Sequence, residues 1–113
     1  MAASHFGLDN VVALNDCNGI QADGRIVRDM EPVSAKWRAF GWDTLEIDGN
    51  DMDQITGALA ASRDRNGRPK AIVLRTLPGK GVLTLECREK AHFMRVEADE
   101  WAELRRELED RHD

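Results

Sequence analysis

Stretches of continuous or alternating apolar residues predict three β-strands in this chain. Residues 8–16 (LDNVVALND) are β-branched and apolar before they become polar, as in a short buried strand that ends at Asn15 and Asp16. Residues 43–49 (DTLEIDG) predict a second short strand. Residues 70–76 (KAIVLRT) form the most continuous apolar run, which is expected of a strand buried on both faces of a sheet.

Between the first two predicted strands, the apolar positions take the spacing of a helix. In EPVSAKWRAFGW, Val33, Trp37 and Phe40 fall at i, i+4 and i+7 and form one apolar stripe. Pro32 suits the first turn of this helix, and Gly41 suits its end. We therefore expect the aromatic residues of this segment to belong to the core or to an interface.

A second helix is predicted between the second and third strands. Asp51 can cap its amino terminus, and Met52, Ile55 and Leu59 then lie on one face. Glu31 suits the start of the preceding helix, because a carboxylate is favourable near the positive end of a helix, and no further role is expected for it.

The last third of the chain has a weaker pattern until its end. Residues 77–96 predict a loop with some irregular structure. Beyond them, Asp99 can cap an amphipathic helix in which Trp101, Leu104 and Leu108 fall at i, i+3 and i+7.

The alternation of strands and helices predicts an α/β fold with a parallel sheet and crossover helices. Three strands are few for such a sheet, and the residues before position 8 supply neither a strand nor a helix in this interpretation. An open sheet edge pairs readily with further backbone. The sequence therefore predicts a partial parallel sheet that is incomplete without a partner chain.

Composition narrows the function classes. The chain has 113 residues, of which 42% are hydrophobic and 33% charged, as in one small globular domain. The net charge of −5 and the few aromatic residues argue against nucleic-acid binding, because no basic stripe or stacking platform is present. The most basic window, RDRNGRPK, contains a glycine and a proline and is interpreted as an exposed loop.

The two cysteines and the apolar runs bear on location. Cys17 and Cys87 form no CxxC pair and have no zinc-site spacing, so both are interpreted as packed side chains in a reducing compartment. No apolar run is long enough for a membrane span, and the amino terminus does not resemble a signal peptide. A cytoplasmic protein without a membrane association is expected.

Polar residues gather directly after the first predicted strand, in Asp16-Cys17-Asn18-Gly19-Ile20, at the start of a loop predicted over residues 17–30. In open parallel sheets, ligands bind beyond the carboxyl ends of the strands. Carboxylate, amide and carbonyl oxygens suit Mg²⁺ or Ca²⁺ better than zinc. The spacing excludes an EF-hand, because Ile20 stands where a third oxygen ligand is needed. A turn in which Asp16 and Asn18 bond their own backbone is the alternative interpretation.

A second candidate is the sequence Gly79-Lys80-Gly81. It is not a P-loop, because it lacks both the earlier glycine at the required spacing and a Ser or Thr after the lysine. Flexible glycines beside Lys80 would nevertheless suit a phosphate, and a plain surface turn is the alternative.

Four motifs in a fixed order resemble the transketolase family. They are D-x-N-x-I-x-x-D-G at 16–24, A-F-G-W at 39–42, D-G-x-D at 48–51 and T-x-x-G-K-G-V at 76–82, followed by His92. Each motif is weak alone, but their order and spacing together are specific. The resemblance covers about residues 8–92 and implies that residues 8–113 form the C-terminal half of a transketolase-like diphosphate-binding domain.

The resemblance implies thiamine diphosphate and Mg²⁺ (or Ca²⁺) as cofactors. In this family, the diphosphate binds through a divalent ion that is held by an aspartate of an upstream Gly-Asp-Gly, by an asparagine and by a backbone carbonyl. The matching positions are Asn18 for the asparagine and Ile20 for the carbonyl. Asp16 would lie beside the ion or support the loop.

The resemblance also assigns expectations to the later motifs. His92 matches a family histidine that faces the cofactor diphosphate and the substrate, although a surface or packed histidine is the alternative. Gly79 and Lys80 match a loop that borders the active site. Two neighbours of His92 depart from the family pattern, since Ala91 replaces a tryptophan and Phe93 replaces a glycine.

The function implied by the resemblance is that of one subunit of a split thiamine-diphosphate-dependent transketolase-like enzyme, a transferase of two-carbon ketol units that is not active alone. Complementary subunits would supply the Gly-Asp-Gly half and the pyrimidine-binding domain, and the substrate would be a sugar phosphate or a keto compound. The alternatives are a non-catalytic interaction or regulatory module that keeps the fold, and a subunit of another thiamine-diphosphate enzyme.

Overall fold

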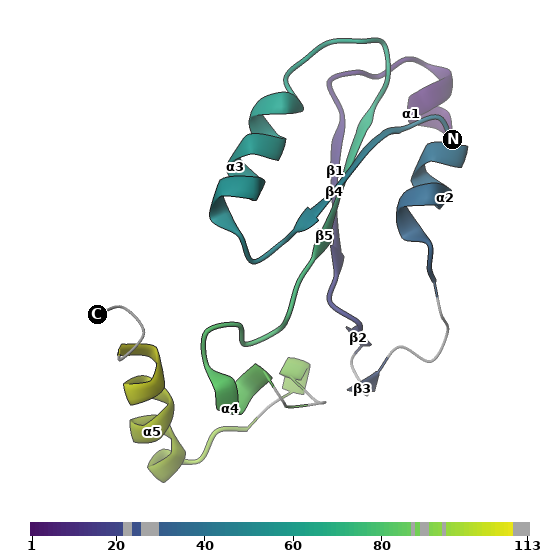
Figure 1. Ribbon diagram of the computed structural model, residues 1–113. Coiled ribbons are helices and arrows are strands. Elements are labelled where there is room, and N and C mark those ends of the chain that lie inside the picture. The colour runs from purple at the N-terminus through teal and green to yellow at the C-terminus, as the bar shows by residue number, and fades with distance from the viewer. Residues whose placement is uncertain (22–23, 26–29, 87, 89–90, 94, 110–113) are drawn as a thin grey trace. The chain divides into compact units, whose positions relative to one another are not determined.

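The chain folds into two compact units (Figure 1). The computed structural model describes residues 1–21, 24–25, 30–86, 88, 91–93 and 95–109. The first unit consists of Met1–Asn18 and Arg28–Thr76, and the second consists of Gly19–Val27 and Leu77–Asp113.

The first unit is built on a parallel sheet with the strand order β1-β5-β4. The strands are β1 (Val12–Cys17), β5 (Lys70–Arg75) and β4 (Asp43–Asp48). Leu14 of β1 and Leu45 of β4 both pair with Ile72 of β5, so residues of one register row share one face of the sheet. The predicted α/β fold with a parallel sheet is confirmed.

The most apolar predicted strand, β5, is the central one. Its residues Ala71, Ile72 and Val73 are buried, and Val73 has an exposed fraction of 0%. A central strand is covered on both faces, which explains why its sequence is continuously apolar rather than alternating.

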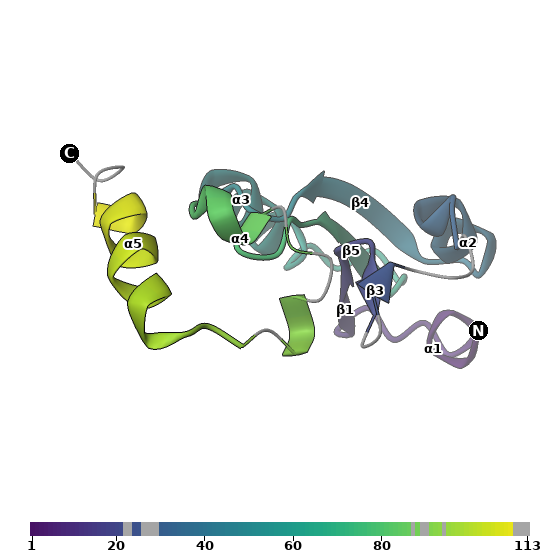
Figure 2. The same cartoon turned by 90° about the horizontal axis from the view of Figure 1, so that it is seen from below.

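Helices α2 (Val33–Ala39) and α3 (Met52–Ala61) lie on opposite faces of this sheet (Figures 1 and 2). Ile47 and Ile72 form a core with Ala58 of α3. On the other face, Trp37 of α2 donates a hydrogen bond to Asn15 of β1. The helix expected around Trp37 is therefore confirmed, and it covers the face to which the odd-numbered residues of β1 point.

The amino terminus contains a short helix that the sequence interpretation missed. Helix α1 covers Ala2–His5, where two consecutive alanines favour helix, and Ser4 Oγ donates to the carbonyl of Gly41 at 3.2 Å. Turns occupy the residues that follow, so β1 begins at Val12 rather than at residue 8.

Asp51 caps α3 as predicted, because its Oδ1 accepts the backbone N–H groups of Asp53 at 2.9 Å and Gln54 at 3.1 Å. The predicted apolar face is only partly correct. Met52 and Leu59 are exposed, and the helix contacts the core through Ala58, where a small side chain allows close approach.

The second unit contains short elements. They are β2 (Ile20–Gln21) and β3 (Gly24–Arg25), which pair antiparallel, α4 (Leu83–Glu86), the 3₁₀ helix η1 (Ala91–Phe93), and α5 (Ala98–Glu109). The loop predicted over residues 17–30 was therefore wrong in part, since Cys17 belongs to β1 and two short strands follow it. Within the described residues, no helix is long and apolar enough to cross a membrane.

Helix α5 confirms the predicted helix, but its cap and its apolar face need correction. It begins at Ala98, so Asp99 lies in its first turn instead of capping it. Of the predicted apolar face only Leu104 is buried, with an exposed fraction of 4%, whereas Trp101 is 60% and Leu108 45% exposed. Inside its unit, α5 is joined to α4 because the hydroxyl of Thr84 donates to the carboxylate of Glu107.

Candidate functional site

The carboxyl end of β1 brings two predicted site residues together. Asn18 Nδ2 donates to Asp16 Oδ2 at 3.0 Å, and the hydroxyl of Thr76 donates to Asp16 Oδ1. Since the amide nitrogen of Asn18 is directed at Asp16, its oxygen lies on the other side of the amide group. The two side chains therefore contact each other, and Asp16 also joins the end of β1 to the end of β5.

This arrangement fits a hard divalent cation as part of a larger ligand set. The amide oxygen of Asn18 is one of the hard oxygen donors that Mg²⁺ and Ca²⁺ prefer, whereas both carboxylate oxygens of Asp16 already accept hydrogen bonds. Among the described residues, no group of three or more His, Cys, Asp and Glu side chains is placed to hold a metal ion. An ion at Asn18 would therefore take its charged ligands from elsewhere, as the family pattern implies.

A charged network lies on the α2 face at the same edge of the sheet. Arg75, the last residue of β5, binds Glu46 Oε1 through Nε at 2.8 Å and Glu31 Oε2 through Nη2 at 2.9 Å. Its Nη1 also contacts Glu31 Oε1, and the hydroxyl of Ser34 donates to Glu46. The guanidinium is thus shared between Glu46 of β4 and Glu31, which lies two residues before α2.

The network changes the acidity of its members. Hydrogen bonds from Arg75 and from the backbone N–H of Val33 lower the pKa of Glu31 to about 2. A hydrogen bond from Arg75 and a weaker effect of the hydrogen bond from Ser34 hold the pKa of Glu46 below its usual value. Both carboxylates carry a negative charge at neutral pH. Because they are partly exposed, solvent screens these ion pairs.

Cys17 is a packed side chain rather than a reactive one. It is partly buried, burial raises the pKa of its thiol, and Asn15 Nδ2 lies 3.6 Å from its sulfur. A thiol with a raised pKa is a weak nucleophile at neutral pH. The partial burial of Cys17 agrees with its interpretation as a packed side chain, whereas Cys87 lies outside the described residues.

The remaining predicted site residues belong to the second unit. Ile20 lies in β2, where it pairs with Arg25. Gly79 has a φ of +73°, and a Cβ at this position would lie 2.6 Å from the Cβ of Leu85, so the turn requires glycine. His92 is exposed in η1, beside the exposed Phe93.

Lys80 contacts an acidic side chain in the same unit. Its Nζ lies 3.9 Å from Glu86 Oε1, and the backbone N–H of Gly81 donates to the same oxygen at 2.9 Å. A carboxylate therefore occupies the position at which the N–H and the ammonium group of this loop converge. These two groups are thus engaged by a carboxylate of the chain itself, and phosphate binding by this loop stays a prediction.

Sequence reasoning missed Arg75, Thr76 and Glu46. The sequence does contain a signal, because Arg75 and Thr76 are the polar end of an otherwise apolar central strand. Carboxyl ends of parallel strands meet at one edge, so these two residues had to lie near Asp16 once the strand order was known.

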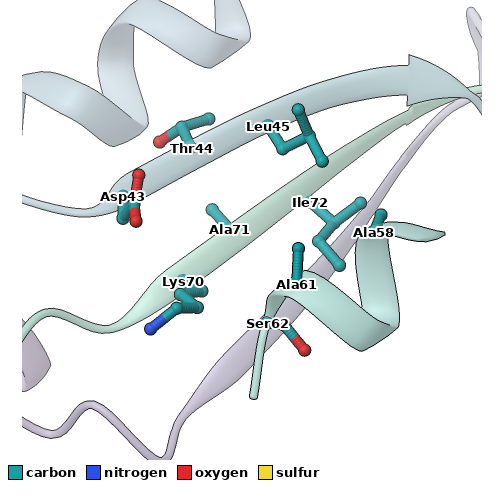
Figure 3. Close-up of a pocket in the computed structure, with 9 residues that line it drawn as sticks. All are labelled: Asp43, Thr44, Leu45, Ala58, Ala61, Ser62, Lys70, Ala71 and Ile72. Carbon is teal, nitrogen blue, oxygen red and sulfur yellow. The ribbon is translucent and has the colours of Figure 1, made fainter. Parts of the chain in front are cut away.

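A pocket of about 220 Å³ lies away from these residues, between α3 and the amino-terminal halves of β4 and β5 (Figure 3). Its lining is Asp43, Thr44, Leu45, Ala58, Ala61, Ser62, Lys70, Ala71 and Ile72. It contains no predicted site residue. Lys70 is buried here, and its Nζ donates to Asn66 Oδ1 at 3.3 Å.

Known proteins resemble this chain along most of its length. A family model described as the thiamine diphosphate binding domain of transketolase matches residues 1–111. An uncharacterised transketolase family protein of Sinorhizobium fredii is 44% identical over 106 residues, which are 91% of this chain and 38% of the relative. The 6-deoxy-6-sulfo-D-fructose transketolase subunit of a Clostridium species (strain MSTE9) is 36% identical over 111 residues, which are 96% of this chain and 40% of the relative.

The fold has a counterpart among solved structures. A transketolase of Pichia stipitis matches 98% of this chain and 20% of its own length, with a TM-score of 0.65 and 23% sequence identity. This likeness shows a common fold. The chain thus spans well under half the length of the curated relatives that it matches, 38% and 40% in the two cases above.

Proposed function

The chain belongs to the transketolase family, in the thiamine diphosphate binding domain, and from this premise we propose that it supplies the metal-binding side of a cofactor site in a transketolase of several subunits. The observation that supports this most directly is the contact of Asn18 with Asp16 at the carboxyl end of β1. It orients an amide oxygen at the place where open parallel sheets bind ligands.

Two neutral oxygens would bind the ion. They are Oδ1 of Asn18 and the backbone carbonyl of Ile20, which would hold Mg²⁺ (or Ca²⁺) against the diphosphate. Asp16 would not bind the ion itself but would keep the Asn18 amide in the required orientation. Outer hydrogen bonds of this kind set the position of metal ligands.

Residues of the second unit would meet the phosphates and the substrate. Lys80 would offer positive charge to the diphosphate, and Gly79 would let the backbone approach it. His92 would serve as the proton-handling or phosphate-facing group near the substrate. The bound cofactor itself supplies the carbanion chemistry of two-carbon ketol transfer.

We also propose that complementary subunits complete the site, since the relative from Clostridium is named as a transketolase subunit. They would bring the Gly-Asp-Gly aspartate and the pyrimidine-binding domain, and the substrate would be a sugar phosphate or a keto compound. The edge strand β1 supports this. Helix α3 packs on Ile47 of β4 and Ile72 of β5, whereas on the same face of β1 Leu14 is 58% exposed and Val12 is 36% exposed. Further sheet or helix would cover both side chains.

The test is a titration of the assembled enzyme with Mg²⁺ at a fixed concentration of thiamine diphosphate, with binding measured by calorimetry. Asn18→Ala should raise the apparent dissociation constant of Mg²⁺ about 10-fold or more. The control is Asn10→Ala, which replaces an exposed asparagine in the turn before β1 and should leave the constant unchanged. Equal constants in the two variants would contradict the proposed function.

A further inference from the structure

Two consecutive residues at the end of the central strand hold two different segments of the first unit. Thr76 donates to Asp16 at the end of β1, and Arg75 binds Glu31 just before α2. Successive residues of an extended chain point to opposite sides, so the pair can reach partners on both faces of the sheet.

The first of these contacts fixes the entry to the segment between β1 and α2. Asp16 accepts the Thr76 hydroxyl on Oδ1 and the Asn18 amide on Oδ2. With both oxygens engaged, the carboxylate cannot rotate without breaking a hydrogen bond. The orientation of the Asn18 amide is therefore determined, through one intermediate side chain, by Thr76.

The second contact fixes the exit from the same segment. The carboxylate of Glu31 accepts hydrogen bonds from two nitrogens of Arg75, and its Oε2 also accepts one from the backbone N–H of Val33 at 3.1 Å. Arg75 is held in turn by Glu46 of β4. A bidentate guanidinium–carboxylate pair fixes direction as well as distance, so it sets where the chain leaves the segment.

We propose that Arg75 and Thr76 are positioning residues for metal binding, because Thr76 holds Asp16, which orients the proposed ligand Asn18, and Arg75 holds Glu31 beside the same strand ends. This inference rests on the proposed function. Anchoring these side chains before the ion arrives lowers the conformational entropy that binding must remove. We call the contacts of these two residues with Asp16 and Glu31 the strand-end clamp.

In the strand-end clamp, Thr76 contributes a hydroxyl hydrogen bond and Arg75 an ion pair, so each contact can be removed by its own substitution. Thr76→Val removes the hydroxyl and keeps the β-branched shape, whereas Thr76→Ser keeps the hydroxyl and serves as the rescue variant. Arg75→Gln removes the ion pair with Glu31. The matched controls are Thr44→Val, on the neighbouring strand β4, and Arg65→Gln, which removes an exposed ion pair of 3.1 Å with Asp9.

Hydrogen exchange of backbone amides in the assembled enzyme without Mg²⁺ tests the clamp directly. Thr76→Val should speed exchange at residues 18–21 about 3- to 10-fold, which corresponds to the loss of one hydrogen bond. Arg75→Gln should do the same at Val33 and the first turn of α2. Thr76→Ser and both controls should match the wild type. Unchanged exchange in Thr76→Val and Arg75→Gln would overturn the proposal.

Mg²⁺ titration then separates this proposal from the proposed function. Thr76→Val and Arg75→Gln should each raise the apparent dissociation constant about 3- to 10-fold. If Asn18→Ala weakens Mg²⁺ binding but these two variants do not, the clamp is refuted and the proposed function stands. If Asn18→Ala has no effect, the proposed function fails and so does the role of the clamp in metal binding.

Discussion

The indole Nε1 of Trp37 donates a hydrogen bond to Asn15 Oδ1 at 2.9 Å, which joins α2 to β1 one residue before Asp16. The same asparagine contacts the sulfur of Cys17 through its nitrogen. Trp37 also packs edge-to-face on Trp42, with ring centroids 4.7 Å apart. The tryptophan therefore fixes the α2 face of β1 next to the strand end that carries the candidate site.

Removing this hydrogen bond should destabilise the first unit. Trp37→Phe keeps an aromatic ring but loses the N–H, so the free energy of unfolding should fall by about 1 kcal/mol or more. Urea unfolding followed by circular dichroism measures the change. Trp101→Phe, at an exposed position of α5, is the control and should change the stability by less than about 0.5 kcal/mol. Similar losses in both variants would show that the Asn15 contact adds nothing.

The ion pair of Glu31 should make stability depend on pH in the acid range. The folded-state pKa of Glu31 is about 2, below its usual value of 4.5, so the contribution of this carboxylate is complete above pH 4.5 and is lost as the pH falls towards 2. The lowered pKa of Glu46 adds to the same trend. The urea midpoint of the wild type should therefore fall more between pH 5 and pH 3 than that of Glu31→Gln. Parallel slopes for the two proteins would argue against the ion pair with Arg75.

The uncovered edge of the sheet should cause association of the isolated chain. Leu14 and Val12 expose apolar surface on β1, whose outer backbone edge has no neighbouring strand within the described residues. Light scattering after size exclusion should detect dimers or larger species of the purified 113-residue chain, and Leu14→Lys should raise the monomer fraction. A monodisperse wild-type monomer with a cooperative thermal transition is the result that contradicts this expectation.

Gly79 and Gly57 should respond to alanine in opposite directions. Gly79→Ala places a Cβ against Leu85 at a positive φ and should cost about 1–2 kcal/mol of stability. Gly57 lies inside α3, where a Cβ would meet no atom within 4 Å, so Gly57→Ala should stabilise the chain by about 0.5–1 kcal/mol. Denaturant unfolding of both variants checks the signs. Destabilisation by both substitutions would show that the space around Gly57 is not open.

Neutralising Lys80 should weaken binding of the cofactor diphosphate. Lys80 is about half exposed, so Lys80→Gln should raise the dissociation constant of thiamine diphosphate in the assembled enzyme only about 2- to 5-fold. Lys36→Gln, which removes a lysine from α2 in the other unit, is the control. Calorimetric titration measures both, and identical constants would remove Lys80 from the proposed site.

The sequence was most informative where one strong local signal, a continuous apolar run or a capping side chain, marked a segment. The run KAIVLRT predicted the buried central strand, and Asp51 correctly marked the start of α3. It was less informative where short-range propensity competed with tertiary contacts. Helix α1 and the paired strands β2 and β3 each have too few residues to show a period.

The residues of the candidate site also fall into two groups, those that the local sequence revealed and those that only the fold brings together. Asp16 and Asn18 were found from local chemistry, since both follow one strand and their oxygens suit a cation. Arg75, Glu46 and Glu31 come from three separate segments, and only the strand order brings them together. A pairing over 44 residues of sequence, as between Arg75 and Glu31, leaves no periodic signal in a single chain.

The parallel direction of the three strands has a practical consequence for measuring this protein. At the amino edge, Asp9 binds Arg65 and the backbone N–H of Gly67, and six-residue strands separate this edge from Asp16 and Thr76 by about 20 Å. Arg63 is exposed and directly follows Ser62, which lies beside Asp43 and Lys70 at the starts of β4 and β5, so an affinity handle or a fluorescent dye attached at position 63 would leave the carboxyl edge untouched. Surface immobilisation through that residue would present the carboxyl edge of the sheet to dissolved ions.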